Sequence, residues 1–214
     1  MKKEILKKEK INMGIVVKET GGGNFELIPA DNHLAMCYQV IDLGTHKRSF
    51  NGKDKFQRLI KIIFELPDLQ KEFVAGEGLK PYSISREFTA SLHKEASLRK
   101  ILESWRGKVF SEDELKGFEL SKLLGKPCLL QVVHSDDGKY ANIMSIAKCP
   151  KSMIAPEKTV NECLEFSLDE FNQETFNKLP EYLRTKIQES NEWKNISGHP
   201  VEMSSGETPN EDIF

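Results

Sequence analysis

The sequence predicts a mainly β protein: a small five-stranded β-barrel with one principal helix between its third and fourth strands, followed by a C-terminal helical extension. Short apolar runs rich in Ile, Val and Phe lie between Gly, Pro and Asp turns, which is typical of β-strands. One segment near the middle of the chain instead has apolar residues at helical spacing. With 214 residues, of which 38% are hydrophobic and 30% charged, the chain can hold one principal domain with extensions.

Three strands are expected in succession, as an antiparallel meander. Residues 34–43 alternate between two faces, and Gly44 is expected to end this strand. Residues 55–66 have a mixed period that leaves a helix open, but their Ile and Phe content favours a strand. A turn at 77–81 precedes the third strand, at residues 82–90.

The apolar period then changes from strand to helix. Residues 93–105 place their apolar side chains on one helical stripe, and Gly107 follows where a helix cap would lie. Trp105 belongs to that stripe and is interpreted as a core residue beneath the barrel. Ser111 and Glu114 have the spacing of a capping box, which predicts a short helix.

Two further strands complete the domain. Residues 127–134 are strongly apolar, residues 136–139 read Asp-Asp-Gly-Lys, a tight hairpin turn, and residues 140–148 form the partner strand. The order β-β-β-α-β-β is the connectivity of an oligonucleotide-binding barrel, the OB-fold. The same order also fits other small β-barrels and some α+β sheets.

The chain is expected to have four parts: a basic, flexible arm at 1–24, the barrel domain at 25–151, an extension at 152–193 and a disordered acidic tail at 194–214.

The extension is expected to contain an edge strand at 160–168, a helical turn at 174–177 and a helix at 180–190. It either caps the barrel or forms a surface for self-association. Trp193 either lies in that interface or is the last ordered residue before the tail.

The tail ends in Glu211, Asp212, Ile213 and Phe214, and no Lys or Arg follows Val201. Such a tip suits a partner with a shallow apolar pocket for Phe214, bordered by Lys or Arg. It resembles the acidic tip of bacterial and phage single-stranded DNA-binding proteins, although it has fewer acids and has Ile where the bacterial form has Pro. The resemblance implies that the tip recruits replication or repair proteins. An ordinary frayed terminus is the alternative.

The overall charge hides an asymmetry along the chain. The formal net charge is -2, but Lys and Arg dominate the N-terminus and the stretch 47–61, whereas acids gather near the C-terminus. The four cysteines are far apart and are expected to be reduced thiols. No stretch approaches the length of a membrane span, so we expect a soluble, cytoplasmic protein.

No enzyme is expected. Five histidines occur without a nucleophile elbow or a cysteine signature, and no phosphate-binding loop is present. Asp136 and Asp137 beside His134 could suggest a metal site, but a tight hairpin explains them. We therefore expect neither a metal nor a cofactor.

Residues 32–151 resemble a family of small phage-encoded single-stranded DNA-binding proteins with an OB-fold. The matching stretches read YQVIDLG at 38–44, SLHKEASLR at 91–99, WRGK at 105–108, LGKPC at 124–128 and YANI at 140–143. The resemblance implies a role in DNA replication, recombination or repair.

Residues that would bind DNA are inferred from chemistry, because a single-strand binder needs basic side chains for phosphates and exposed aromatics for stacking. The candidates are Lys47, Arg48, Phe50, Lys53, Lys55, Arg58, Lys61, Tyr82, Arg86, Arg106 and Lys108. Each has a plainer alternative. Phe50 could fold back over the barrel end, the basic run could be a solvated hairpin, and Tyr82 could belong to the core.

The sequence therefore predicts a sequence-tolerant single-stranded DNA-binding protein that acts in replication, recombination or repair and is possibly a homo-oligomer. The rival hypothesis is a non-enzymatic protein-interaction module, such as an inhibitor or virion-associated protein, on a similar barrel.

Overall fold

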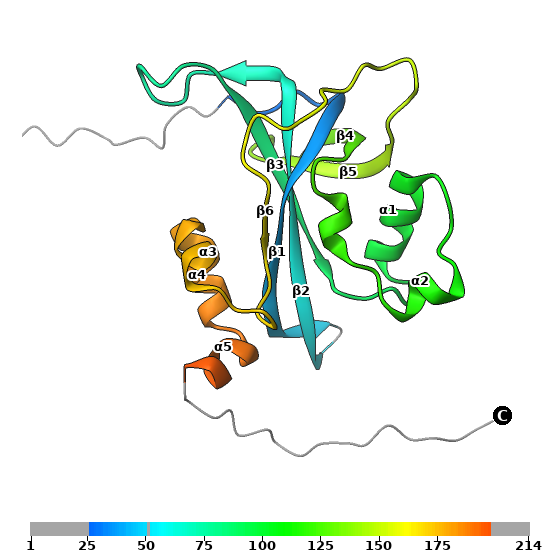
Figure 1. The fold of residues 1–214 in the computed structure, drawn as a ribbon, viewed down its shortest axis with the longest axis vertical. Coiled ribbons are helices and arrows are strands. Elements are labelled where there is room, and N and C mark those ends of the chain that lie inside the picture. Colours follow the sequence, from blue (N-terminus) through cyan, green and yellow to red (C-terminus); the bar gives the residue numbers. More distant parts are fainter. Residues whose placement is uncertain (1–25, 51, 198–214) are drawn as a thin grey trace, which may run out of the picture.

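The computed structural model describes residues 26–50 and 52–197, and it is a mainly β structure with short helices (Figure 1). The neighbour order in the sheet is β3-β2-β1-β4-β5, and β6 lies parallel to β1. The other pairs are antiparallel. The strands are β1 (Asn32–Phe50), β2 (Lys53–Lys71), β3 (Lys80–Thr89), β4 (Pro127–His134), β5 (Ala141–Lys148) and β6 (Leu164–Phe166).

The first strand is longer than predicted, because Gly44 does not end it. β1 continues to Phe50 and keeps its pairing with β2, with a register shift between Asp42 and Gly44. Gly44 has a φ of 78°, and a Cβ there would lie 2.4 Å from the Cβ of Ser190. The glycine therefore marks a bulge at which the C-terminal extension packs against the strand.

The sheet does not close through a ladder within the described residues. β3 and β5 are its two ends, and Arg86 of β3 joins them by donating to the carbonyl oxygens of Ile143, at 3.0 Å, and Met144, at 3.2 Å. The mainly β class agrees with the sequence analysis, whereas a closed five-stranded barrel stays a prediction.

The helices follow local signals well. Gly107, with a φ of 67°, caps α1, and Ser111 and Glu114 make both hydrogen bonds of the predicted capping box. Within residues 26–50 and 52–197 no helix is long and apolar enough to cross a membrane. The helices are α1 (Ser97–Arg106), α2 (Glu112–Lys116), the 3-10 helix η1 (Leu120–Leu123), α3 (Gln173–Lys178), α4 (Glu181–Gln188) and α5 (Asn191–Ile196).

Two hydrophobic cores lie on opposite faces of the long strand β2. Ile62 and Phe64 belong to the first core, where the Phe64 ring lies 5.4 Å from that of Trp105 on α1. Leu59 and Ile63 belong to the second core, which the extension covers. Because both faces are buried, the strand lacks simple alternation, which explains its mixed period in the sequence.

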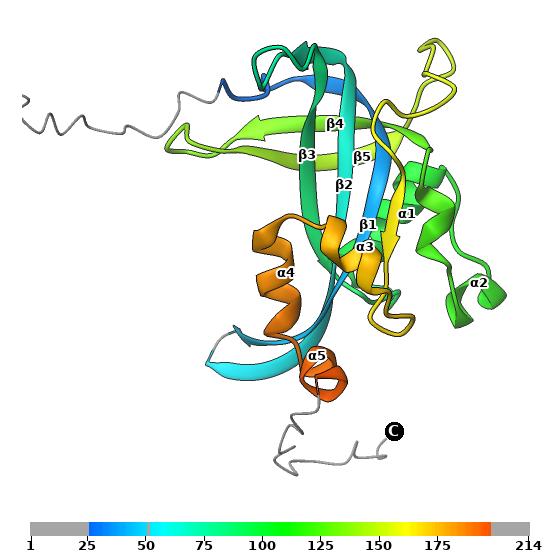
Figure 2. The ribbon, with the colours of Figure 1, turned by 60° about the vertical axis from the view of Figure 1, so that its left-hand side comes forward.

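The extension caps one face of the sheet. Leu183 and Ile187 of α4 are fully buried against β1 and β2, and the Phe176 ring stacks on Trp193 at 4.6 Å. Figures 1 and 2 show α3–α5 on one side of the β1–β2 hairpin and α1 and α2 on the other. Trp193 is partly buried in α5, a helix that the sequence analysis missed and that continues into the expected tail as far as Ile196.

Buried carboxylates fasten the extension to the sheet. Glu65 is fully buried and accepts hydrogen bonds from the backbone N–H groups of Val160, at 2.7 Å, and Asn161, at 2.9 Å. Asp42 accepts from the N–H of Leu168 at 3.1 Å and from Arg58. Such bonds are charge-assisted and satisfy groups that would otherwise be costly to bury.

Candidate nucleic-acid interface

The structure divides most of the predicted DNA-binding residues among three places, and Arg58 and Lys61 lie outside them. The first is the end of the β1–β2 hairpin, the second is β3 with a neighbouring pocket, and the third is the end of α1. The predicted tip Glu211–Phe214 and the arm at 1–24 lie outside the described residues.

The hairpin end comprises residues 47–50 and 52–56. Its register pairs Lys47 with Phe56 and Phe50 with Lys53, so that a basic residue faces an aromatic one in each pair, and it pairs the two basic residues Arg48 and Lys55. Gly52 turns the chain with a φ of 72°, a conformation that suits glycine.

The basic side chains of the hairpin end are exposed. Lys53 and Lys55 make no ion pair with any residue that the structure describes, whereas Lys47 bonds Asp54 at 2.6 Å. That hydrogen bond holds the pKa of the Asp54 carboxyl below its ordinary value. The hairpin end therefore presents more positive than negative charge to solvent.

Phe56 is the exposed aromatic side chain of the hairpin end, at 63% exposure, and the sequence analysis did not name it. In the sequence, Phe56 falls on the same strand face as Ile60 and Ile62, which suggested that its side chain points into the core. A usable signal was present, because residues 53–58 contain no other apolar side chain and the buried run starts only at Leu59. The side chain of Phe50 lies outside the part of the chain that the structure describes.

Arg58 and Lys61 are placed differently from the prediction, because carboxylates of β1, of β3 and of the extension engage them. Arg58 pairs with Asp42 and, at 2.9 Å, with Asp169. The hydrogen bond to Asp42 is the main reason that the pKa of Arg58 is raised. Lys61 has a side chain only 13% exposed, 3.6 Å from Glu87.

Glu87 on β3 lies within ion-pair distance of Lys186, Lys61 and Arg48. It accepts from Lys186 of α4 at 2.8 Å and lies 3.7 Å from Arg48. Burial raises the pKa of Glu87, but Lys186, Lys61 and Arg48 outweigh it and the pKa is lowered. Helices α3–α5 thus cover the strand face around the second core, whereas Lys53, Lys55 and Phe56 at the hairpin end stay exposed.

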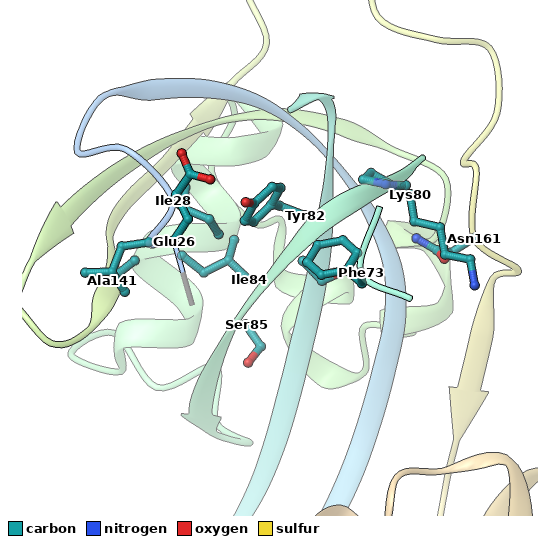
Figure 3. A pocket seen from close by; sticks show the side chains of 12 residues that line it. Glu26, Ile28, Phe73, Lys80, Tyr82, Ile84, Ser85, Ala141 and Asn161 are labelled. Carbon is teal, nitrogen blue, oxygen red and sulfur yellow. The ribbon is translucent and has the colours of Figure 1, made fainter. Parts of the chain in front are cut away.

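Tyr82 lines a pocket of about 600 Å³ beside β3 (Figure 3). Its ring meets that of Phe73 edge to face at 5.1 Å, and Phe73 is about half exposed. Lys80 and Glu26 also line the pocket. Phe73 was not predicted, because it lies between the predicted second strand and the turn at 77–81, in a stretch assigned to no element; its ring continues the aromatic surface that Tyr82 begins.

Arg86 leaves the core as predicted, but it does so by bonding backbone carbonyls of β5 and by lying over the Phe88 ring at 5.3 Å. Its donors to Ile143 and Met144 hold β3 against β5. Arg86 is therefore a structural residue in this arrangement and not an open phosphate contact.

Arg106 and Lys108 line a second pocket, which we call the α1–η1 pocket. The Arg106 guanidinium lies between the rings of Phe110, at 4.3 Å, and Phe118, at 4.9 Å, and pairs with Glu114. Lys108 is exposed and lies 3.2 Å from the same carboxylate. A hydrogen bond from the backbone of Ser111, together with these cations, lowers the pKa of Glu114 to about 2.

The described residues form no cluster of side chains that could bind a metal ion. Among residues 26–50 and 52–197, no group of three or more His, Cys, Asp or Glu side chains could hold a metal ion. The cysteines are free thiols; Cys37 and Cys128 are buried, whereas Cys149 is partly exposed and Cys163 exposed. Burial raises the pKa of the Cys37 and Cys128 thiols.

No protein-family model, curated protein or solved structure matches this chain. Its function has to be inferred from the surfaces of the chain itself.

Proposed function

We propose that this protein binds single-stranded DNA without sequence preference and acts in DNA replication, recombination or repair. The observation that carries the proposal is the hairpin end, where Lys53 and Lys55 are exposed beside Phe56. Basic side chains can neutralise phosphates, and an exposed ring can stack on any base. Both interactions are sequence-tolerant.

The sheet supports this proposal through its strand order. The order β3-β2-β1-β4-β5, with Arg86 linking β3 to β5, is the arrangement that an OB-type barrel requires, and we propose that the strands form such a barrel. Because α3–α5 cover the strand face, we place DNA at the hairpin end and, beside β3, at the pocket of Phe73 and Tyr82.

We further propose that the C-terminal residues Glu211, Asp212, Ile213 and Phe214 recruit replication or repair proteins. Their order, two acids followed by two apolar residues, is what supports this role. The acidic tail also competes with DNA for basic side chains at low salt, so its removal is expected to tighten DNA binding.

Fluorescence anisotropy of labelled oligo-dT tests the proposal, using the full chain and a truncation that ends before Glu207, at several salt concentrations. We expect micromolar or tighter binding that weakens with salt and survives duplex competitor. Lys116→Glu is a matched control, because Lys116 is exposed on α2 and belongs neither to the hairpin end nor to the lining of the pocket of Phe73 and Tyr82. Absence of binding by both constructs at low salt would exclude the proposal.

The second candidate is a protein-interaction module, and one observation favours it. The loop 149–163 exposes Met153, Ile154 and Val160, with Ile154 94% exposed. If this loop is the functional surface, Ile154→Asp abolishes an association between copies of the chain that is visible by sedimentation velocity. It also leaves any binding of oligo-dT unchanged.

A further inference from the structure

The α1–η1 pocket combines an apolar floor with a basic rim. Its volume is about 470 Å³, within the range of roughly 300–1,000 Å³ found for small-ligand sites. The floor consists of Trp105, Phe118, Leu123 and Pro127, and the rim consists of Arg106, Lys108, Lys122, Lys126 and Lys148.

The positive charge of this rim is only partly compensated. Among the residues that the structure describes, Glu114 is the one acid that lines the pocket; Arg106 and Lys108 share it, and Lys122 pairs with Glu119 at 3.1 Å. Lys126 and Lys148 make no ion pair with any residue in the described ranges. The rim can therefore accept further negative charge.

A hydrogen bond is also missing at this pocket. Nη1 of Arg106 is buried and has no partner among the described residues, although the rest of the guanidinium is held by Glu114 and two aromatic rings. A buried donor without an acceptor is costly, so an acceptor brought by a ligand would be favourable. Charge and hydrogen bonding both indicate an acidic ligand, and the floor indicates that it has an apolar part.

The chain contains a segment with this chemistry. Glu211 and Asp212 are followed directly by Ile213 and Phe214, and no Lys or Arg occurs from Val201 onward. The acidic side chains are complementary in charge to the lysines of the rim, and the large apolar side chains suit the aromatic floor.

We propose that the α1–η1 pocket binds residues 211–214 of the same chain. Phe214 and Ile213 contact the floor, and Glu211 and Asp212 pair with Lys126 and Lys148. The pocket thereby holds the segment that recruits partners, and a partner protein has to compete with the pocket for it. This site is separate from the hairpin end and does not depend on DNA binding.

The length of the chain permits this contact. Residues 198–214 follow the last described residue, and an extended chain spans roughly 3.3–3.6 Å per residue, or about 55 Å for this segment. A domain of this size is roughly 40 Å across. The segment is also tethered, so even weak contacts act at a high effective concentration.

Photo-crosslinking of the full chain, with p-benzoylphenylalanine in place of Phe214, tests the proposal. We expect crosslinks within one chain to the segments 105–127 and 148–149, identified by mass spectrometry. The double change Lys126→Glu with Lys148→Glu is expected to reduce their yield by about fivefold or more, because it replaces two favourable ion pairs by repulsion. The matched control, Lys94→Glu with Lys100→Glu, makes the same change of charge on exposed residues that lie outside both the pocket and the hairpin end, and it is expected to leave the yield unchanged.

Three outcomes would overturn the proposal: crosslinks to the hairpin end without any to the pocket, crosslinks only between chains, or an undiminished yield in the pocket variant. Hydrogen exchange supplies a second readout. In the full chain, Phe214→Ala is expected to raise exchange in residues 118–127. That change keeps the acids of the tail, so it is expected to leave the oligo-dT affinity within about twofold of the original. Unchanged exchange would contradict the docking even if DNA binding is established.

Discussion

The hairpin end and the α1–η1 pocket carry similar charge but present it in opposite shapes. At the hairpin end the lysines stand on two projecting strands, and the aromatic ring of Phe56 is 63% exposed. In the pocket the lysines surround aromatic residues that recede, and Trp105 is only 5% exposed. A projecting ring can stack on a base of a passing strand, whereas a recessed floor accepts a compact side chain. The shape of the apolar surface, more than the charge, therefore separates the ligands of the two regions.

The largest expected effect is the loss of oligo-dT affinity when charge is reversed at the hairpin end but not when it is reversed in the pocket. The double change Lys53→Glu with Lys55→Glu is expected to weaken oligo-dT binding by about tenfold or more and to lower the salt slope by about 1.4, since each phosphate contact contributes about 0.7. The change Lys126→Glu with Lys148→Glu is expected to alter the affinity by less than about twofold. Anisotropy at several salt concentrations measures both. Equal losses in the two variants would show that the pocket is part of the DNA path.

Stacking is the next largest effect. Phe56→Ala is expected to weaken oligo-dT binding by about 1 kcal/mol, or roughly fivefold, with an unchanged salt slope because no charge is removed. Tyr140→Ala is the control, since Tyr140 is 64% exposed but lies at the β4–β5 turn. Thermal unfolding should show little change for either variant, because both rings are mostly exposed. A larger loss for Tyr140→Ala would move the site to that turn.

Acid is expected to loosen the packing of the extension (α3–α5) on the sheet. The pKa values of Glu87 and Glu192 lie below the ordinary value of 4.5: burial raises both, but Lys186 at Glu87 and Thr45 at Glu192 outweigh it. Their contribution to stability is therefore fully present above pH 4.5 and is lost as the pH falls through the lowered pKa values. The protection factors of residues 181–196, which correct hydrogen exchange for its intrinsic pH dependence, are expected to fall below pH 4.5.

Glu87→Gln is the matched variant for this pH dependence. At neutral pH it is expected to cost at most about 1 kcal/mol in the free energy of unfolding, because the ion pairs of Glu87 are partly exposed. Its exchange profile should depend less on pH than that of the original chain. An unchanged pH dependence would assign the acid effect to other carboxylates.

The smallest expected effect concerns one acid at the hairpin end. Asp54→Asn removes the partner of Lys47 and is expected to tighten oligo-dT binding by about twofold, because one more cation can meet a phosphate. Asp113→Asn is the control, since Asp113 pairs with Lys116 on α2 at 2.7 Å. Weaker binding after Asp54→Asn would indicate that Asp54 positions Lys47 for DNA instead of competing for it.

Local signals in the sequence predicted local structure well. The strand β4 spans the predicted residues, the Asp-Asp-Gly-Lys turn connects it to β5, and the capping box of α2 forms as expected. The helical stripe that ends at Trp105 lies in the core. Each of these features depends on neighbours within a few residues, so their composition and spacing are sufficient to predict them.

The candidate site was predicted less completely. Lys47, Arg48, Lys53 and Lys55 do gather at an exposed hairpin end, but Arg58 and Lys61 are engaged by Asp169 and Glu87, which lie far from them in the sequence. Phe56 and Phe73 were missed, since their exposure depends on where the strands emerge from the two cores.

The sequence by itself determined β4, the turn that follows it, the caps of α1 and α2 and the location of the basic hairpin, because these follow from apolar period, turn residues and local charge. The tertiary structure alone decided that β1 continues through Gly44, that the extension covers one face of the sheet, and that Arg106 lines a basic pocket with an aromatic floor. These outcomes depend on contacts between segments far apart in the chain, such as Gly44 with Ser190. A residue's exposure and partners are set by those contacts and not by its own neighbours.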